Sequence, residues 1–321
     1  MRIFARSAML AVLLLASAPA FAQSYPSRPI TMIVPYAAGG SVDAVARLVS
    51  DRLDARLGGQ IVIENVAGAG GIIGTQRAAR AEPDGYTLLL SVNATVVMNP
   101  FTYKNFPFDP AKDMVGISRM TETYMALVVP ASSPIKSISD LIAEAKKQPG
   151  KLSYGSAGHG SGHHIAGETL NRKAGIEVMH VPFVGTAPAV TNVVGGHITM
   201  TYATLPTVVS FVENGQLRII GMAEDNRVKS RPDIPTIAEV VPGVTTSTWY
   251  GLFAPAGTPQ PVIDRLYKAV RFALDDPDTQ KKLERSGFSL VGSTPAELDA
   301  RVKRDLDYWR ETIRAANIEP K

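Results

Sequence analysis

The sequence predicts an α/β protein of two lobes, in which each lobe is a doubly wound, mostly parallel sheet with helices. Short apolar runs rich in strand-forming residues alternate with helical patterns over residues 30–91, and the alternation returns over residues 127–181. Parallel strands joined by crossover helices produce such alternation. A hydrophobic content of 45% with 27 glycines and 23 prolines describes a compact chain with many tight turns.

A near-repeat suggests where the chain crosses between the lobes. LVVPASSP, residues 127–134, and LFAPAGTP, residues 252–259, are each an apolar strand, Pro-Ala, a small pair and a proline before a helix. Parallel-sheet segments can also look alike for packing reasons only, and this alternative stays open. The crossing interpretation gives two hinges and two lobes: hinges at residues 121–126 and 247–252, a first lobe of residues 23–123 plus 247–321, and a second lobe of residues 124–246.

Capping residues mark two helix starts. Ser137 is followed by Asp140, and Thr294-Pro295 is followed by Glu297, which is the pattern of an N-cap with an acidic residue three positions on. Apolar residues then recur at helical spacing over residues 298–313. The sequence therefore predicts a long amphipathic helix near the C-terminus.

The first residues of the chain have the features of a secretory signal peptide. Arg2 and Arg6 precede an apolar run over residues 8–16, and residues 20–22, Ala-Phe-Ala, form a small-residue cleavage pattern. The run is much shorter than the roughly 20 residues of a membrane span. We therefore expect residues 1–22 to be removed and the mature chain to act in the periplasm.

The composition excludes several kinds of site. There is no cysteine, so a lipid anchor on cysteine, disulfides, thiolate metal sites and a cysteine nucleophile are excluded. The net charge of +4 falls by two when Arg2 and Arg6 leave with the signal peptide, and no block of lysines and arginines has interleaved aromatic residues. We expect a monomer that binds no nucleic acid.

The stretch YGSAGHGSGHH, residues 154–164, is the first candidate binding loop. A short strand precedes it and a helix begins near Gly162, so its backbone N–H groups are expected beyond the carboxyl end of a strand, where open α/β sheets bind ligands. No lysine lies between Lys151 and Lys173, as a Walker loop would need, and His163 stands where the dinucleotide fingerprint has its last glycine. The expected ligand is an anion other than a nucleotide phosphate.

The histidines and serines of this stretch form no metal or catalytic motif. There is no HExxH pattern, and adjacent histidines rarely face one ion, so one of His163 and His164 is expected to pack while the other reaches the cleft. Neither Ser156 nor Ser161 has a G-x-S-x-G setting. We expect no catalytic residue, no metal and no cofactor. Either these hydroxyls and the backbone N–H groups hold an oxyanion, or the glycines only turn the chain and Ser161 caps the helix.

A matching loop occurs in the other predicted lobe. VPYAAGGSVDAVAR, residues 34–47, again runs from a strand through small residues and glycines into a helix. Asp43 in the first helical turn is interpreted as a complement to the helix dipole. Two strand-loop-helix starts, one in each lobe, can face each other across a cleft.

Five blocks of the sequence resemble one known family. VPYAAGGSVDAVAR, ENVAGAGGIIGTQRAARAEPDGYTLLL, YGSAGHGSGHHIAGE, HVPFVGTAPAVTNVVGGHI and WYGLFAPAGTP, in this order, are similar to the tripartite tricarboxylate transporter substrate-binding proteins, also called TctC-like or Bug proteins. The resemblance covers nearly all of the mature chain. It implies a type II-like, two-lobed periplasmic binding protein, not an enzyme, that closes on a small carboxylate. Its implied partners are the membrane permease subunits of a tripartite tricarboxylate-type transporter.

The resemblance also implies where the ligand binds. In the family the two loops hold a carboxylate through backbone amides, small hydroxyls and waters, and other turns and strand ends line the rest of the cleft. The implied ligand-binding residues are Tyr36, Ala38 and Gly39 in the first lobe, Ser156, His159, Gly160 and Ser161 in the second, and Asn93, Phe183, Thr186 and Tyr202 around the cleft.

Departures from the family pattern concern specificity. Relatives often have an aspartate near Thr199, and its absence from this sequence favours a purely acidic or aromatic acid as the ligand. A second departure is His159, which stands where an amide side chain is common in the family. Candidate ligands range from di- and tricarboxylates to aromatic acids, and Tyr36, Phe183 and Tyr202 favour a planar acid. Two alternatives stay open: a periplasmic sensor subunit that signals to a membrane kinase, and an enzyme acting on a small acid.

Overall fold

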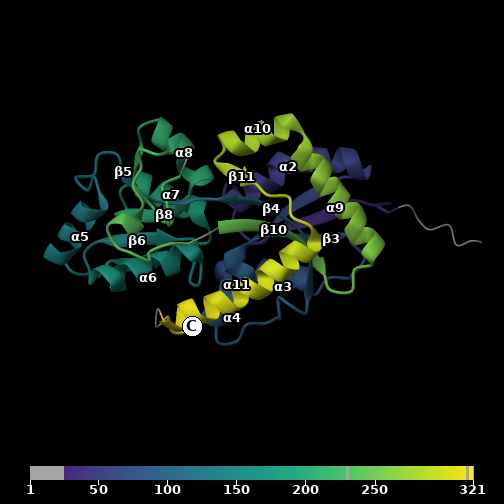
Figure 1. Ribbon diagram of the computed structural model, residues 1–321, viewed down its shortest axis with the longest axis horizontal. Helices are drawn as coiled ribbons and strands as arrows, with labels where there is room; N and C mark the ends of the chain where they lie inside the picture. Colours follow the sequence, from purple (N-terminus) through teal and green to yellow (C-terminus); the bar gives the residue numbers. More distant parts are fainter. Residues whose placement is uncertain (1–24, 229–230, 247, 316–317, 321) are drawn as a thin grey trace, which may run out of the picture.

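The computed structural model describes residues 25–228, 231–246, 248–315 and 318–320, which fold into two lobes (Figure 1). The predicted signal peptide, residues 1–22, lies outside the described residues. Within the described ranges, no helix is both long and apolar enough to cross a membrane. The predicted two-lobed α/β fold is confirmed, because each lobe is one sheet with helices packed on it.

Six strands form the sheet of the first lobe, on the right in Figure 1: β1 (Ile30–Val34), β2 (Ile61–Asn65), β3 (Thr87–Val92), β4 (Met114–Thr123), β10 (Thr248–Pro255) and β11 (Phe288–Leu290). Their order is β11-β4-β10-β3-β1-β2. β1 pairs in parallel with β2 and β3, whereas β10 is antiparallel to β3 and β4, and β11 is antiparallel to β4.

Five strands form the sheet of the second lobe: β5 (Met125–Pro130), β6 (Ser153–Ser156), β7 (Met179–Pro182), β8 (Met200–Thr204) and β9 (Leu217–Met222). Their order is β7-β6-β8-β5-β9. β6 pairs in parallel with β7 and β8, and β5 is antiparallel to β8 and β9.

Both sheets are mixed, which corrects the expectation of mostly parallel strands. Every antiparallel pair includes β4, β5 or β10, the strands next to the points where the chain passes between the sheets. A parallel pair needs a crossover connection within one lobe. A strand that enters a sheet from the other lobe has no crossover helix to make it parallel to its neighbours. Here β5 and β10 run antiparallel to the strands beside them.

The chain passes from one sheet to the other at two places. Tyr124 alone separates β4 from β5, and residues 223–246 lead from β9 back toward β10, with residue 247 outside the described part of the chain. The two near-repeat segments therefore begin in β5 and β10, which are the first strands after the two passages.

Helices pack on both faces of each sheet. In the first lobe these are α2 (Ser41–Leu57), α3 (Ile72–Ala79), α4 (Asn99–Thr102), α9 (Gln260–Asp275), α10 (Pro277–Arg285) and α11 (Pro295–Ala315), with the short turns η1 (Ala69–Gly71) and η2 (Ala94–Met98). In the second lobe they are α5 (Ile138–Lys147), α6 (Gly162–Ala174), α7 (Thr186–Val194), α8 (Leu205–Glu213) and the turn η3 (Ile237–Glu239).

The central strands are apolar because both of their faces are buried. In β1, Ile30 and Met32 pack with α2 and α9, while Ile33 packs in the cluster on the opposite face with residues of α3 and α11. In β5, Leu127 and Val128 likewise belong to different clusters on the two faces of the second sheet. Successive side chains of a strand point to opposite faces, so an unbroken apolar run is what a central strand of such a sheet requires.

The predicted amphipathic helix near the C-terminus is confirmed as α11, in yellow in Figure 1. Its first turn is capped by Thr294, whose hydroxyl accepts a hydrogen bond from the Glu297 N–H while the Glu297 carboxylate accepts one from the Thr294 N–H. The side chains at its predicted apolar positions are buried against the first lobe: Leu298, Val302, Trp309 and Ile313.

Candidate functional site

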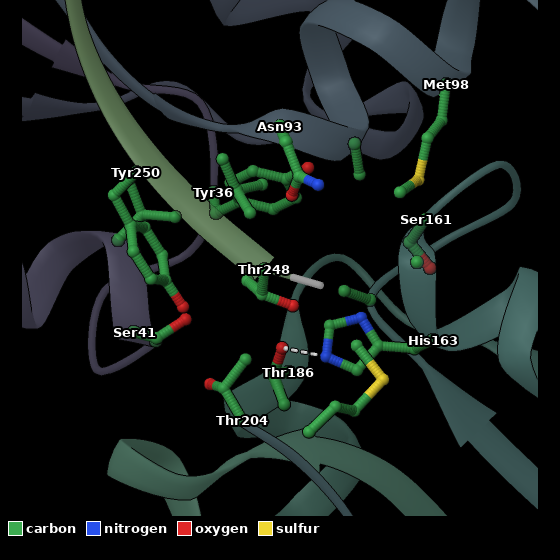
Figure 2. Close-up of a pocket in the computed structure, with 17 residues that line it drawn as sticks. Tyr36, Ser41, Asn93, Met98, Ser161, His163, Thr186, Thr204, Thr248 and Tyr250 are labelled. Atoms are coloured by element: carbon green, nitrogen blue, oxygen red, sulfur yellow. Dashed lines mark hydrogen bonds between the residues drawn. The ribbon is translucent and has the colours of Figure 1, made fainter. Parts of the chain in front are cut away.

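A cavity lies between the two sheets, and residues of both lobes line it (Figure 2). The space inside it that water can occupy is about 30 Å³, room for one or two water molecules, so the lobes leave little free volume between them in this structure. The lining residues are Tyr36, Gly40, Ser41, Val42, Val92, Asn93, Ala94, Met98, Thr248 and Tyr250 from the first lobe, and Met125, Ala157, Ser161, Gly162, His163, Thr186 and Thr204 from the second.

Four helices begin at this cavity. Helix α2 of the first lobe and helices α6, α7 and α8 of the second are each the next element after a strand, and residues of their first turns or N-caps are in the lining. The first N–H groups of a helix have no partner within the helix, and the helix dipole is positive at that end. The topology thus places the unpaired N–H groups of four helix starts around one cavity.

Three of the four helix starts leave these donors without a side-chain cap. The N-cap residues of α2, α7 and α8 are Gly40, Gly185 and Thr204, and none accepts a capping hydrogen bond with its side chain. None of the described lining residues is an acid, a lysine or an arginine, and burial raises the pKa of Tyr36 and Tyr250, so both phenols are neutral. An anion is the ligand that such neutral donors favour.

The first-lobe loop, residues 36–40, is held in place by Asp43. The Gly39 N–H donates to Asp43 Oδ2 over 3.0 Å, and Arg47 Nε donates to the same oxygen over 2.9 Å. Asn65 Nδ2 donates to Asp43 Oδ1 and to the Tyr36 carbonyl, both over 3.1 Å. The carboxylate therefore orients the loop from behind and is absent from the cavity lining.

The second-lobe loop, residues 157–161, presents Ser161 to the cavity. Ser161 Oγ donates to the Gly158 carbonyl over 2.6 Å and accepts from the His164 N–H over 3.3 Å, so it caps α6 as well as lining the cavity. Ser156 is fully buried, and its hydroxyl lies 2.6 Å from His180 Nε2, away from the lining.

Of the adjacent histidines at the start of α6, His163 reaches the cavity and His164 packs. His163 Nε2 lies 3.4 Å from Thr186 Oγ1, whereas its Nδ1 has no hydrogen-bond partner among the described residues. Burial lowers the pKa of His163 to about 4, so the imidazole is neutral near pH 7. The His164 ring packs against the rings of His159 and His180.

The loops of the two lobes touch at a seam beside the cavity. Tyr103 Oη of the first lobe donates to the His159 carbonyl over 2.8 Å, and His159 Nε2 lies 3.1 Å from the Thr102 carbonyl. Gly158 is packed so closely on Gly70 that a Cβ atom at Gly158 would lie 3.3 Å from the Gly70 Cα. The lobes are therefore closed over the cavity in this structure.

The structure brings only part of the sequence-based site to the cavity. Tyr36, Asn93, Ser161 and Thr186 are in the lining, and Ala38 and Gly39 directly precede the lining residue Gly40. The others are placed elsewhere. Ser156 is paired with His180, and His159 and Gly160 lie at the lobe seam. Phe183 is partly buried against a second-lobe cluster, and Tyr202 is buried against Tyr154.

Sequence reasoning missed several lining residues. Ser41 follows the glycines of the first loop, Thr204 immediately precedes a helix with proline in its first turn, and Thr248 and Tyr250 lie at alternate positions of β10. For Ser41 and Thr204, the sequence signal was their position at a helix start. For Thr248 and Tyr250, it was the WYG segment just after the chain returns to the first lobe.

A two-lobed α/β fold with a cavity between the lobes is the architecture of periplasmic solute-binding proteins. Comparison with known proteins then gives the family. Residues 45–318 match the family described as tripartite tricarboxylate transporter family receptor. The chain belongs to this family, which consists of solute-binding receptors and not of enzymes.

Relatives in sequence and in structure agree with this assignment. A protein of Pseudomonas sp. (strain P51), named "UPF0065 protein in tcbD-tcbE intergenic region", is 37% identical over 292 residues, which are 90% of this chain and 87% of that protein. The structure of the periplasmic binding protein BugD has a TM-score of 0.88 at 33% identity and covers 92% of this chain and 100% of its own.

Two related structures contain a bound acid. Rpa4515 of R. palustris with adipate has a TM-score of 0.89 at 30% identity, with 92% of this chain and 100% of that chain covered. MatC (Rpa3494) from Rhodopseudomonas palustris with bound malate has a TM-score of 0.86 at 31% identity, with 90% and 100% covered.

Proposed function

We propose that this chain captures a small carboxylate, a di- or tricarboxylate or an aromatic acid, in the interlobe cavity and delivers it to the permease of a tripartite tricarboxylate-type transporter. The observation that supports this most is the convergence of four helix starts, three without a side-chain cap, on a cavity whose described lining holds no charged side chain. Malate and adipate, bound by two relatives, are acids of this kind.

The binding residues that we propose combine both lobes. Backbone N–H groups at the starts of α2, α6, α7 and α8 take the carboxylate oxygens, and Ser41, Asn93, Thr186 and Thr204 add side-chain hydrogen bonds beside Tyr36. Ser161 keeps its hydroxyl proton on the Gly158 carbonyl and contributes by capping α6. A hydrogen bond to a charged group contributes about 1.5–3 kcal/mol. Several such bonds are needed to replace the water lost by a buried carboxylate, and no single lobe supplies all of them.

Closure of the lobes is the proposed mechanism of capture. The lobes would be residues 23–123 plus 247–321 and residues 124–246, and would rotate about residues 121–126 and 247–252. A ligand that bonds to both lobes binds the closed form better than the open one, and so shifts the population toward closure. Export through the signal peptide at residues 1–22 would place this cycle in the periplasm.

A thermal-shift panel tests the ligand class. Malate, adipate and terephthalate are each compared with their primary diamides, which keep the shape and lose the charge. A ligand that binds only the folded protein raises its melting temperature by mass action. We expect at least one acid to raise it and the corresponding amide to leave it unchanged. A set of shifts in which amides equal acids, or in which only amines or sugars stabilise the protein, contradicts a carboxylate site.

Delivery is tested separately, by uptake of the labelled acid into cells that lack this protein and into cells that carry it. Loss of uptake without the protein, and its return with the wild-type chain, supports the transport role. If uptake is unchanged while the transcriptional response to the acid disappears, the protein is a sensor subunit instead.

A further inference from the structure

Glu224 is a partly buried acid at the hinge, outside the lining of the ligand cavity. It lies two residues after the end of β9, and its Oε1 atom accepts a hydrogen bond over 3.1 Å from the Met125 N–H. Met125 is the first residue of β5, immediately after the first passage between the lobes, and it lines the ligand cavity. The Glu224 carboxyl therefore holds the backbone at the point where the hinge meets the cavity.

Groups of both lobes surround this carboxyl in the closed structure. Glu122 of β4, in the first lobe, is close enough for its negative charge to act on Glu224. Helix α11 of the first lobe, in yellow in Figure 1, borders the pocket that Glu224 lines. The other residues of this pocket are Asp225, Thr245 and Thr246 of the second lobe and Arg301, Arg304, Asp305, Tyr308 and Trp309 of the first.

The arginines near Glu224 do not neutralise it. Arg301 pairs with Asp305 over 2.7 Å, both on α11. Arg119 pairs with Glu122 over 3.3 Å. Arg304 lines the pocket, but among the described residues no ion pair joins it to Glu224. The carboxyl is thus enclosed by both lobes without a cation bound to it.

This environment favours the protonated form of Glu224. Burial is the main cause, and the charges of Asp225 and Glu122 add to it, so that the pKa of Glu224 rises from 4.5 to about 8 in spite of the hydrogen bond from Met125. A carboxyl in water is ionised at pH 7. The closed form therefore holds a proton here that a hydrated carboxyl would release. The protonated group still accepts from the Met125 N–H with one oxygen.

We propose that closure of the lobes on the ligand takes up one proton from solution, and that Glu224 at the hinge binds it. This inference rests on the proposed function, because it needs lobes that open and close. Rotation about residues 121–126 moves Glu122 and α11 relative to Glu224, and in the open form water reaches the carboxyl and ionises it. Capture of an acid is then coupled to capture of a proton.

The direction of the pH dependence follows from the higher pKa of Glu224 in the closed form, which binds the proton more tightly than the open form does. The gain in affinity is complete at low pH, diminishes as the pH rises from about 4.5 to about 8, and is absent above that range. Wild-type protein is therefore expected to bind the tightest-binding acid of the panel at least about fivefold more weakly at pH 8.5 than at pH 6.5.

Calorimetric titration at pH 7.5 in Hepes, triethanolamine and Tris counts the protons directly, because these buffers differ in their enthalpies of ionisation. A histidine with the ordinary pKa of about 6.5 is mostly neutral at this pH and exchanges few protons. The wild type is expected to take up about half a proton or more for each acid bound. Glu224→Gln keeps an acceptor for the Met125 N–H and resembles the protonated carboxyl. It should take up less than about one fifth of a proton and lose the pH dependence.

Glu177→Gln is the matched control, because Glu177 is exposed on the same lobe and outside the pocket. It should take up as many protons as the wild type does, and melting temperatures show that each variant is folded. If an acid binds but the wild type takes up no proton, or if Glu224→Gln takes up as many as the wild type, the role of Glu224 is wrong while the carboxylate site stands. If no acid binds the wild type, the proposed function itself fails, and this inference with it.

Discussion

At the scale of single residues, Asp43 serves the site without lining it. Burial by itself raises the pKa of this carboxyl, but hydrogen bonds from Arg47, from the Gly39 N–H and from Asn65 outweigh it, so the pKa lies below the ordinary value of 3.8. The folded protein therefore binds this proton less readily than the unfolded chain. The stabilisation is complete above about pH 5 and is lost as the pH falls through the lowered pKa.

This argument predicts the acid sensitivity of the protein. Asp43→Asn removes the titrating group but nearly keeps its shape, so the melting temperature of the variant should fall less than that of the wild type between pH 6 and pH 3. Asp51→Asn, at an exposed position of the same helix, is the control and should follow the wild type. Thermal melts over a pH series measure this, and parallel curves for Asp43→Asn and wild type would contradict the role of Asp43.

Single residues are also where sequence reasoning was least accurate. It selected His159 as a binding residue and expected one of His163 and His164 to reach the cleft, without saying which. The structure places His163 in the cavity lining and His159 at the seam between the lobes. Adjacent residues at a helix start point about 100° apart. Which of them faces a ligand depends on how the helix is rotated against the sheet, and that rotation is fixed by tertiary packing.

Strand residues show the same limit. Thr204 is the last residue of β8 and reaches the cavity, whereas Tyr202, two positions earlier on the same face, packs against Tyr154 in the core. The sequence indicates that a strand ends there. It does not show how many of the last residues extend beyond the core.

At the scale of elements, the helix starts were the most predictable part of the site. The glycine-rich loops before α2 and α6 were expected to present backbone donors, and both starts are in the cavity lining. Small residues after an apolar run are a strong local signal, because only they allow the chain to turn tightly into a helix. The starts of α7 and α8 have weaker signals, since a threonine is the only small polar residue that marks each.

The start of α2 offers a direct test of backbone binding. Gly40 is extended, with φ −79° and ψ 170°, as the residue before a proline must be, and Ser41 is at the first helical position, where proline is favoured. Ser41→Pro therefore removes a backbone N–H and the hydroxyl, whereas Ser41→Ala removes the hydroxyl alone.

We expect Ser41→Pro to bind the tightest-binding acid of the panel at least tenfold more weakly than Ser41→Ala does. Calorimetric titration measures the two affinities, and thermal melts verify that both variants remain folded. Equal affinities would mean that the N–H group at the start of α2 takes no part in binding.

At the scale of the whole molecule, the proposed mode of capture requires the lobes to meet. Gly160 has φ 76°, and a Cβ atom there would overlap Thr102 Oγ1 and lie 2.7 Å from Asn99 Oδ1, both on the opposite lobe. Gly196 has a similar φ of 72° but nothing within 4 Å of its Cβ position. Alanine at either position has the same backbone strain, about 1 kcal/mol, but only Gly160→Ala obstructs the seam.

Gly160→Ala is therefore expected to weaken acid binding at least tenfold, and Gly196→Ala to bind as the wild type does. Small-angle scattering should show that the radius of gyration of the wild type and of Gly196→Ala decreases when a saturating acid is added, while that of Gly160→Ala does not. Wild-type affinity and full contraction in Gly160→Ala would show that the observed seam is not needed for capture.

The fold was more predictable from sequence than the site, for a physical reason. Two lobes follow from the repeated alternation of strands and helices and from the near-repeat in β5 and β10, which are long-range patterns that average over many residues. Strand direction was less predictable, because the strands next to the passages between lobes have no crossover helix to fix their orientation.

The central claim is that neutral donors of both lobes hold the charge of the ligand. A crystal structure of the protein with the tightest-binding acid of the panel tests it most directly. We predict carboxylate oxygens within about 3 Å of backbone nitrogens at the start of α2 and at the start of at least one helix of the second lobe. A carboxylate paired with a lysine or arginine side chain, or bound to one lobe only, would contradict the account.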